Sequence, residues 1–216
     1  MGLSTLKIKK YYMKIKRYIR FIKESSDYSL GCIMIELDID NWLDICSYIE
    51  PKDIYHDVND PTYGIQNNPH LTLFYGFHKE VTTEQISNII DDIVYDWRNK
   101  GLEDFDYDDV SDRITIEDAT DKPIQIEVNG IDVFENEKFD VVKLNVVKTD
   151  LLQNLNDALS KLPNSNEFPD YKPHITIAYV KNGTGSKYIK PDYKNNFESN
   201  SLCYSKPNGE KIYFEI

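Results

Sequence analysis

Two spacings of apolar residues divide the chain into segments of predicted strand and predicted helix. Short apolar or alternating runs predict strands, which lie at residues 31–39, 113–118, 124–136 and 140–147 and around His70 and His174. Apolar residues three or four positions apart predict helices at residues 40–50, 81–101 and 149–163. Because helices and strands alternate along the whole chain, we expect an α+β fold.

Capping residues and turn formers indicate where several of these elements end. Thr82 or Thr83 is expected to cap the second helix, and Thr149 the third. Near the end of the sequence, Asn208 and Gly209 form the dipeptide that is typical of a tight β-hairpin turn.

One strand motif occurs twice in the sequence. The sequence PHLTLFY begins at Pro69 and PHITIAY begins at Pro173, so the two histidines stand 104 residues apart. A single His-x-Thr in a strand is most often an ordinary structural feature. Two copies with the same flanking proline, aliphatic residues and tyrosine favour an internal duplication. We therefore expect two α+β halves, each of which contributes one histidine strand.

Each copy of the motif presents two polar groups side by side. Side chains alternate between the faces of a strand, so His70 and Thr72 are expected to share one face, as are His174 and Thr176. The aliphatic residues between them are expected to point into the core. A pseudo-two-fold axis between the halves would bring the four polar groups together across a cleft.

The tyrosine that ends each copy is expected to have a different role. By strict alternation Tyr75 and Tyr179 fall on the apolar side of their strands. We therefore expect both to pack in the core or at its rim, and neither to act in catalysis.

Two imidazoles and two hydroxyls are a set that suits phosphodiester cleavage. A neutral histidine takes a proton from an attacking hydroxyl or water, and a protonated histidine gives one to the leaving oxygen. The threonine hydroxyls donate hydrogen bonds to the non-bridging oxygens as negative charge builds on them. The ordinary histidine pKa of about 6.5 suits both roles at neutral pH. The reaction needs no metal or cofactor.

Charge is unevenly distributed and limits the kind of ligand. Residues 1–23 hold eight Lys or Arg and no acid, whereas the remaining chain holds 17 basic and 37 acidic residues, a net charge of −20. Binding a long nucleic acid rests on many Lys and Arg contacts with phosphates, so it is not expected of the main domain. A small phosphate ligand in a locally favourable pocket remains compatible with this charge.

The contrast between the basic N-terminal segment and the acidic remainder also indicates the domain organisation. Residues 1–27 are expected to form a basic amphipathic helix or arm that packs on the acidic body, with contact to a membrane surface or nucleic acid as the less favoured alternative. Residues 28–216 are expected to form a single domain. Three scattered cysteines, and the lack of an apolar stretch that could span a membrane or act as a secretory signal, predict a cytoplasmic protein.

Loops beside the histidine strands offer candidates for substrate binding. Aromatic rings can stack on nucleobases, and lysines can contact a second phosphate, although solvated lysines and structural tyrosines are the ordinary alternative. The candidates are Tyr63, Tyr171, Lys181, Lys187 and Tyr188.

At the motifs HLTL (70–73) and HITI (174–177), the chain resembles the 2H phosphoesterase superfamily, the LigT-like proteins with two His-x-Thr/Ser motifs. The resemblance extends loosely over residues 28–216. It implies a bilobal α+β fold in which two pseudo-symmetric antiparallel sheets flank a central cleft, with the helices outside. It also implies that His70, Thr72, His174 and Thr176 form a metal-independent catalytic set.

Within that superfamily, PHLTLFYGF and KPHITIAYVKNGTGSKY are most similar to the phage anti-CBASS phosphodiesterases, which degrade cyclic oligonucleotide signals. The leading expectation is therefore an enzyme that cleaves small cyclic nucleotides or oligonucleotides, as a phage counter-defence protein does. One alternative is RNA end processing, as a 2′,3′-cyclic phosphodiesterase or a 2′,5′ RNA ligase-like enzyme. Another is a non-catalytic protein that sequesters cyclic nucleotides.

Overall fold

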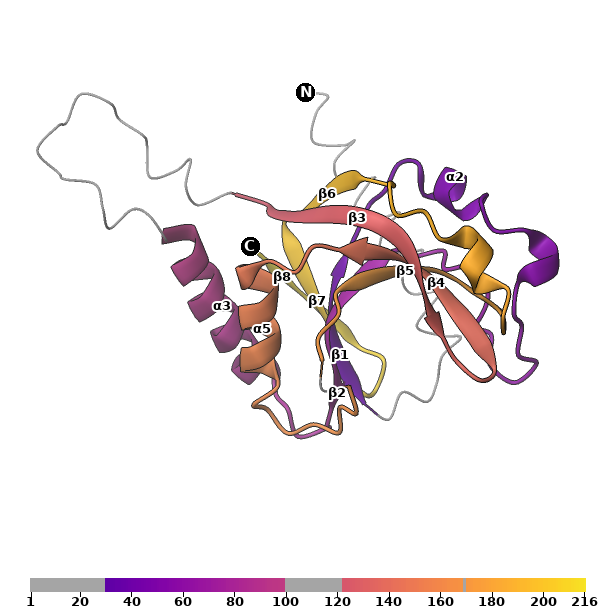
Figure 1. Ribbon diagram of the computed structural model, residues 1–216. Coiled ribbons are helices and arrows are strands. Elements are labelled where there is room, and N and C mark those ends of the chain that lie inside the picture. Colours follow the sequence, from indigo (N-terminus) through magenta and orange to yellow (C-terminus); the bar gives the residue numbers. More distant parts are fainter. Residues whose placement is uncertain (1–29, 100–121, 169) are drawn as a thin grey trace, which may run out of the picture.

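The computed structural model describes residues 30–99, 122–168 and 170–216 (Figure 1). The predicted arm at 1–27 and the strand predicted at 113–118 lie outside these residues.

Eight strands and three α-helices make up the described fold. The strands are β1 Gly31–Glu36, β2 His70–Phe77, β3 Ile124–Glu135, β4 Phe139–Val146, β5 His174–Lys181, β6 Asn195–Ser199, β7 Ser201–Ser205 and β8 Lys211–Glu215. The helices are α2 Trp42–Cys46, α3 Thr83–Asn99 and α5 Asp150–Leu159, with short 3₁₀ helices η1 at Pro51–Asp53 and η2 at Gly185–Tyr188. This composition confirms the α+β class.

The strands form one antiparallel sheet in the order β6-β3-β4-β5-β2-β1-β7-β8. The two expected sheets are thus two halves of four strands, joined where β2 runs beside β5. Figure 1 shows the strands of the two halves running in clearly different directions, so the sheet is strongly curved. The two histidine strands are central neighbours, although they are far apart in the sequence.

The halves are joined by an exchange of short segments. Residues 54–66, which precede β2, pair with the far end of β5: the Tyr55 N–H donates to the Tyr179 carbonyl at 3.0 Å. Residues 163–165, which precede β5, pair in the same way with the far end of β2, where the Ser165 N–H donates to the Gly76 carbonyl at 2.9 Å. This reciprocal arrangement supports the pseudo-two-fold relation of the halves.

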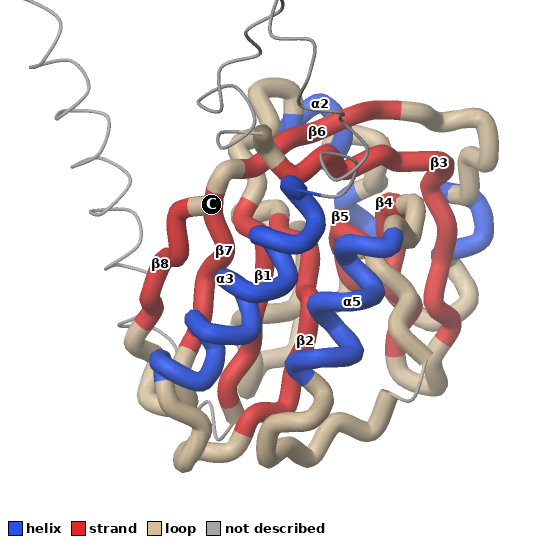
Figure 2. The backbone as a smooth tube through the Cα atoms, turned by 90° about the vertical axis from the view of Figure 1, so that its left-hand side faces the viewer, coloured by secondary structure: helices blue, strands red, loops and turns tan. Residues whose placement is uncertain are grey.

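Helices α3 and α5 lie side by side over one face of the sheet (Figure 2). Their beginnings confirm the expected caps. Thr82 and Gln85 form a reciprocal capping box, in which Thr82 Oγ1 accepts from the Gln85 N–H at 3.2 Å and Gln85 Oε1 accepts from the Thr82 N–H at 2.9 Å. Thr149 Oγ1 accepts from the Leu152 N–H at 3.4 Å at the start of α5.

The outer elements differ in part from the prediction. The hairpin of β7 and β8 confirms the turn at Asn208–Gly209, where Gly209 has φ of +80°. The edge strand β6, whose sequence NNFES is mostly polar, was not predicted; it forms by pairing with β3. Helix α2 is shorter than predicted because the chain leaves it in turns before Pro51.

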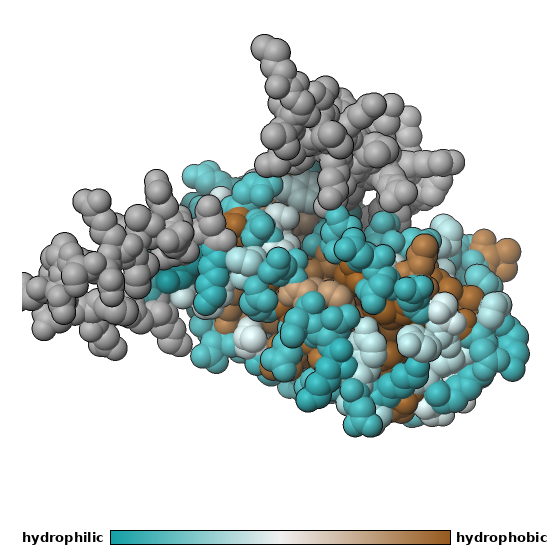
Figure 3. Space-filling model, turned by 90° about the horizontal axis from the view of Figure 1, so that it is seen from above, coloured by the Kyte–Doolittle hydropathy of each residue, from teal (hydrophilic) through white to brown (hydrophobic). Residues whose placement is uncertain are grey.

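The face seen from above is mainly hydrophilic where coloured residues form it, and hydrophobic residues show toward its middle and at its right-hand edge (Figure 3). Among the residues that the structure describes, no helix has the length and apolar character needed to cross a membrane.

Candidate active site

The four predicted catalytic residues lie together on one face of the sheet. Leu71 of β2 is the register partner of Ile175 of β5. Extending this antiparallel register by one residue on each side sets His70 opposite Thr176 and Thr72 opposite His174. All four side chains are half-buried, whereas Leu71 and Ile175, on the other face, are fully buried. We call the side that carries these four residues the histidine face.

Both histidines are held by the same local contact. His70 Nδ1 lies 2.9 Å from the carbonyl oxygen of Asn68, and His174 Nδ1 lies 2.8 Å from that of Lys172. A carbonyl oxygen only accepts hydrogen bonds, so Nδ1 carries the proton in both rings. The other nitrogen, Nε2, is therefore the one available for proton transfer in each histidine.

The surroundings of His174 favour its neutral form. Burial lowers the pKa of His174 below its ordinary value, and the Lys143 ammonium and the His70 ring act in the same direction, against the hydrogen bond to the Lys172 carbonyl. Phe134 packs edge-on against the His174 ring, with centroids 5.0 Å apart and planes at 85°.

The positions of Tyr75 and Tyr179 correct the sequence prediction. A register shift at Leu73 in β2, and a matching one at Ile177 in β5, each insert one extra residue. Beyond each shift the alternation is reversed, so both tyrosines lie on the histidine face, and Tyr75 is 43% exposed. The expected position of both tyrosines on the apolar side of their strands was therefore wrong.

A signal for these shifts was present in the sequence. In each copy of the motif, two adjacent apolar residues directly follow the threonine. They are Leu73-Phe74 and Ile177-Ala178, and all four are buried. Two neighbouring buried residues in a strand break the alternation and are a mark of a bulge. Sequence reasoning missed Tyr75 and Tyr179 as candidate site residues because it assumed regular strands.

A buried lysine stands beside Thr176. Lys143 of β4 is the register partner of Thr176, and its side chain is only 4% exposed. Its ammonium lies 3.5 Å from Asp132 Oδ2, donates to the Asn145 side-chain oxygen and lies 4.3 Å from the centre of the Phe134 ring. Burial lowers the pKa of Lys143, while Asp132 opposes that shift. This cation is well placed to act on charge that develops near Thr176.

The half of the sheet that contains β2 has a polar cluster beside His70. Glu36 of β1 is the register partner of His70. Its carboxylate accepts from Lys211 at 2.8 Å and from the Tyr213 hydroxyl at 3.0 Å. Burial lowers the pKa of Lys211 to about 8. Polar side chains therefore flank both histidines.

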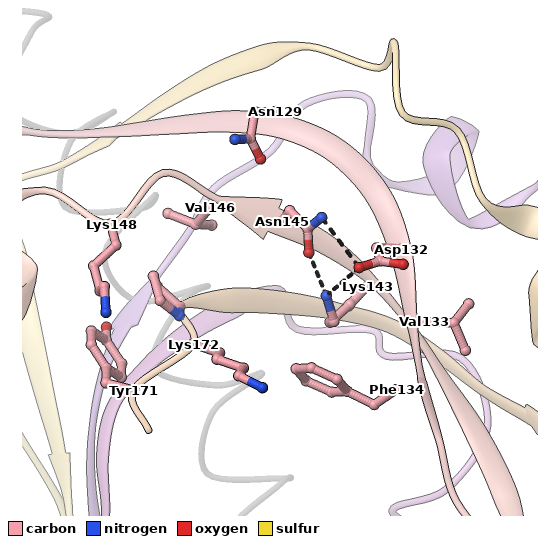
Figure 4. Close-up of a pocket in the computed structure, with 11 residues that line it drawn as sticks. Asn129, Asp132, Val133, Phe134, Lys143, Asn145, Val146, Lys148, Tyr171 and Lys172 are labelled. Carbon is pink, nitrogen blue, oxygen red and sulfur yellow. Dashed lines mark hydrogen bonds and ion pairs between the residues drawn. The ribbon is translucent and has the colours of Figure 1, made fainter. Parts of the chain in front are cut away.

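A pocket of about 510 Å³ adjoins His174. Asn129, Phe134, Lys143, Lys148, Tyr171 and Lys172 are among its lining residues (Figure 4). We call it the lysine pocket. The histidines do not line it, but Phe134 contacts the His174 ring and the Lys172 carbonyl accepts from His174 Nδ1, so the pocket and the histidine face are continuous.

The predicted substrate-binding tyrosines are found in different settings. Tyr63 belongs to an aromatic cluster with Tyr55, Phe139 and Tyr179, with ring centroids 5.0 to 5.2 Å from its own. Through Tyr179 this cluster adjoins the histidine face. Tyr171 lines the lysine pocket, and burial raises the pKa of its hydroxyl.

The other three predicted binding residues have structural contacts away from the histidines. Lys187 pairs with Glu50 at 2.8 Å and with Asp53, whose other contact is the hydroxyl of the buried Tyr188. Lys181 donates to the Lys52 carbonyl at 2.6 Å. These contacts hold η1 against η2. They also engage the ammonium groups of Lys181 and Lys187, which were expected to bind a phosphate.

Comparison with known proteins gives one family match. The model of a family described as the 2′-5′ RNA ligase superfamily matches residues 55–202, more than half of the chain, and the match includes both histidine strands. No curated protein matches the chain.

Several solved structures are similar to it at low identity. Escherichia coli LigT complexed with 3′-AMP is 13% identical with a TM-score of 0.47, and the match covers 87% of this chain and 95% of that one. Kluyveromyces marxianus Usb1 is 9% identical with a TM-score of 0.47, covering 87% and 98%. The PDE domain of MHV ns2 is 12% identical with a TM-score of 0.46, covering 86% and 99%.

Proposed function

We propose, from the premise that this chain belongs to the 2′-5′ RNA ligase superfamily of LigT-like phosphoesterases, that it is a phosphodiesterase acting through His70 and His174. The observation that carries the proposal is the pairing of Leu71 with Ile175, because the register extended from it forms a cross-strand square in which each imidazole stands opposite a threonine of the other half. Such a square can hold one phosphorus centre between two proton-transfer groups and two hydroxyl donors.

The environment of each histidine suggests its role. His174, whose pKa is lowered, is neutral at pH 7 and its Nε2 takes the proton from the attacking hydroxyl or water. As the new phosphorus–oxygen bond forms and the old one breaks, His70 gives the proton of its Nε2 to the leaving oxygen. Thr72 and Thr176 donate to the non-bridging oxygens, and the Lys143 ammonium stabilises the added negative charge.

We further propose a small cyclic nucleotide or oligonucleotide as the substrate. The net charge of −20 over residues 24–216 opposes association with a long phosphate backbone. A compact ligand requires only local positive charge, which Lys143, Lys148 and Lys172 supply beside His174.

The test is incubation of the purified protein with a panel of cyclic di- and trinucleotides in the presence of EDTA, with the products separated by chromatography. Cleavage that persists in EDTA and is lost in His70→Ala and in His174→Ala is the expected result. Cleavage only of RNA ends with 2′,3′-cyclic phosphates would replace the cyclic oligonucleotide substrate with the RNA-processing alternative. Release of the intact nucleotide on denaturation, without turnover, would indicate sequestration and overturn the enzymatic proposal.

A further inference from the structure

The lysine pocket lies where a substrate would extend beyond the reacting phosphate. It adjoins His174 through two shared contacts, the edge of the Phe134 ring and the backbone of Lys172. A ligand with a phosphate between the two histidines can therefore extend its next covalent unit into this pocket. Figure 4 shows the Lys172 side chain pointing across the pocket toward Phe134.

The charge of the pocket favours an anion. Lys143 is compensated by Asp132, but Lys148 and Lys172 are exposed, and neither has a carboxylate within ion-pair distance in the part of the chain that the structure describes. Two uncompensated ammonium groups on one pocket are notable in a body with a net charge of −20. They match the charge of a phosphate group.

Tyr171 contributes its ring, and not its hydroxyl, to the wall of the pocket. The hydroxyl oxygen of Tyr171 is buried and, among the described residues, has no hydrogen-bond partner. Because a ligand in the pocket cannot reach a buried oxygen, the ring is the part of Tyr171 that is available for contact. Across the pocket from Tyr171, the Asn129 side chain supplies a hydrogen-bond donor and acceptor, and Phe134 supplies an aromatic ring.

We propose that the lysine pocket binds the nucleotide unit adjacent to the scissile phosphate, with its phosphate at Lys148 and Lys172 and its nucleoside against Tyr171, Asn129 and Phe134. A volume of about 510 Å³ is within the usual range for small-molecule sites and is far larger than a single phosphate needs. This assignment rests on the proposed function, because it takes the histidine face as the position of the reacting phosphate. It makes the protein selective for substrates with at least two linked nucleotides.

Binding of a defined probe tests the pocket without depending on turnover. The probe is the linear dinucleotide pApA, titrated calorimetrically into His70→Ala protein so that no cleavage interferes. Adding Lys148→Ala and Lys172→Ala together is expected to weaken binding about 10- to 100-fold, since two charge-assisted contacts are lost. Tyr171→Phe, which keeps the ring and removes only the buried hydroxyl, should bind about as the parent does. Lys138→Ala, at an exposed lysine outside the pocket, is the matched control and should bind as the parent does.

The outcomes separate this proposal from the proposed function. An unchanged pApA affinity in the Lys148/Lys172 double variant, or no binding of pApA to either wild-type or His70→Ala protein, overturns the pocket assignment. If no phosphodiester is cleaved but pApA binding still depends on the two lysines, the enzymatic proposal fails and the pocket is a nucleotide-binding site without an adjacent scissile phosphate. Circular dichroism and thermal melts of each variant confirm that the fold is retained.

Discussion

Leu71 and Ile175 are register partners at the centre of the sheet, and both are fully buried beneath the helices. This pair joins the two halves of the molecule and fixes which residues stand opposite one another on the histidine face. A slip of one residue in either strand would turn the histidine of that strand into the core. The aliphatic partners on one face therefore determine the polar geometry on the other.

Shortening one partner should destabilise the fold. We expect Leu71→Ala to lower the free energy of unfolding by about 2–5 kcal/mol, since it leaves a cavity in a fully packed core. Urea denaturation followed by circular dichroism measures the change. Leu43→Ala, at a leucine that is 77% exposed, is the control and should change the free energy by less than about 0.5 kcal/mol. Equal losses in the two variants would contradict the central role of the Leu71–Ile175 pair.

Removing a threonine hydroxyl should slow the chemical step. In Thr176→Val the side chain keeps its shape but can no longer donate to a non-bridging oxygen, and we expect kcat to fall about 100-fold with little change in KM. Thr176→Ser restores the hydroxyl and should recover most of the rate. Steady-state kinetics on the best substrate of the panel distinguish the two. A serine variant as slow as the valine variant would show that packing by the methyl group, and not the hydroxyl, is what matters.

The pH dependence of kcat/KM should report on His174. As the general base it must be neutral, so activity is lost as pH falls through its pKa, which burial and the nearby Lys143 charge lower. We therefore expect the midpoint of the acid limb to lie below about 6.5, the ordinary histidine value. Lys143→Met removes one of the lowering charges, and the midpoint should move to higher pH, while Lys138→Met leaves it in place. Movement of the alkaline limb instead would reverse the assigned roles of the two histidines.

Tyr75 should contribute to substrate binding, contrary to its expected place in the core. Its ring is 43% exposed on the histidine face, where it can stack on a nucleobase. We expect Tyr75→Ala to raise KM about 10-fold, and Tyr75→Phe to leave it nearly unchanged, because stacking needs the ring and not the hydroxyl. Tyr95→Ala, which removes an exposed ring on α3, serves as the control. An unaltered KM in Tyr75→Ala would mean that the base binds elsewhere.

The sequence by itself determined the elements that depend on local interactions. Capping residues placed the start of α3 and of α5, and the alternation His-x-Thr put each imidazole and its hydroxyl on one face. These features involve residues within one turn of helix or one strand, so a local pattern is enough to predict them. The repeat of the motif also predicted that the two histidine strands are equivalent.

Only the tertiary structure decided how those strands meet. The pairing of Leu71 with Ile175, which lie 104 residues apart, merges the two expected sheets into one. The bulges that turn Tyr75 and Tyr179 toward the histidines arise where β2 pairs with β1 and β5 pairs with β4, which are also distant in the sequence. The lysine pocket likewise combines residues of β3 and β4 with the segment just before β5. Register and bulges follow from how distant side chains fill a shared core, and that information is not contained in the spacing of residues along any single segment.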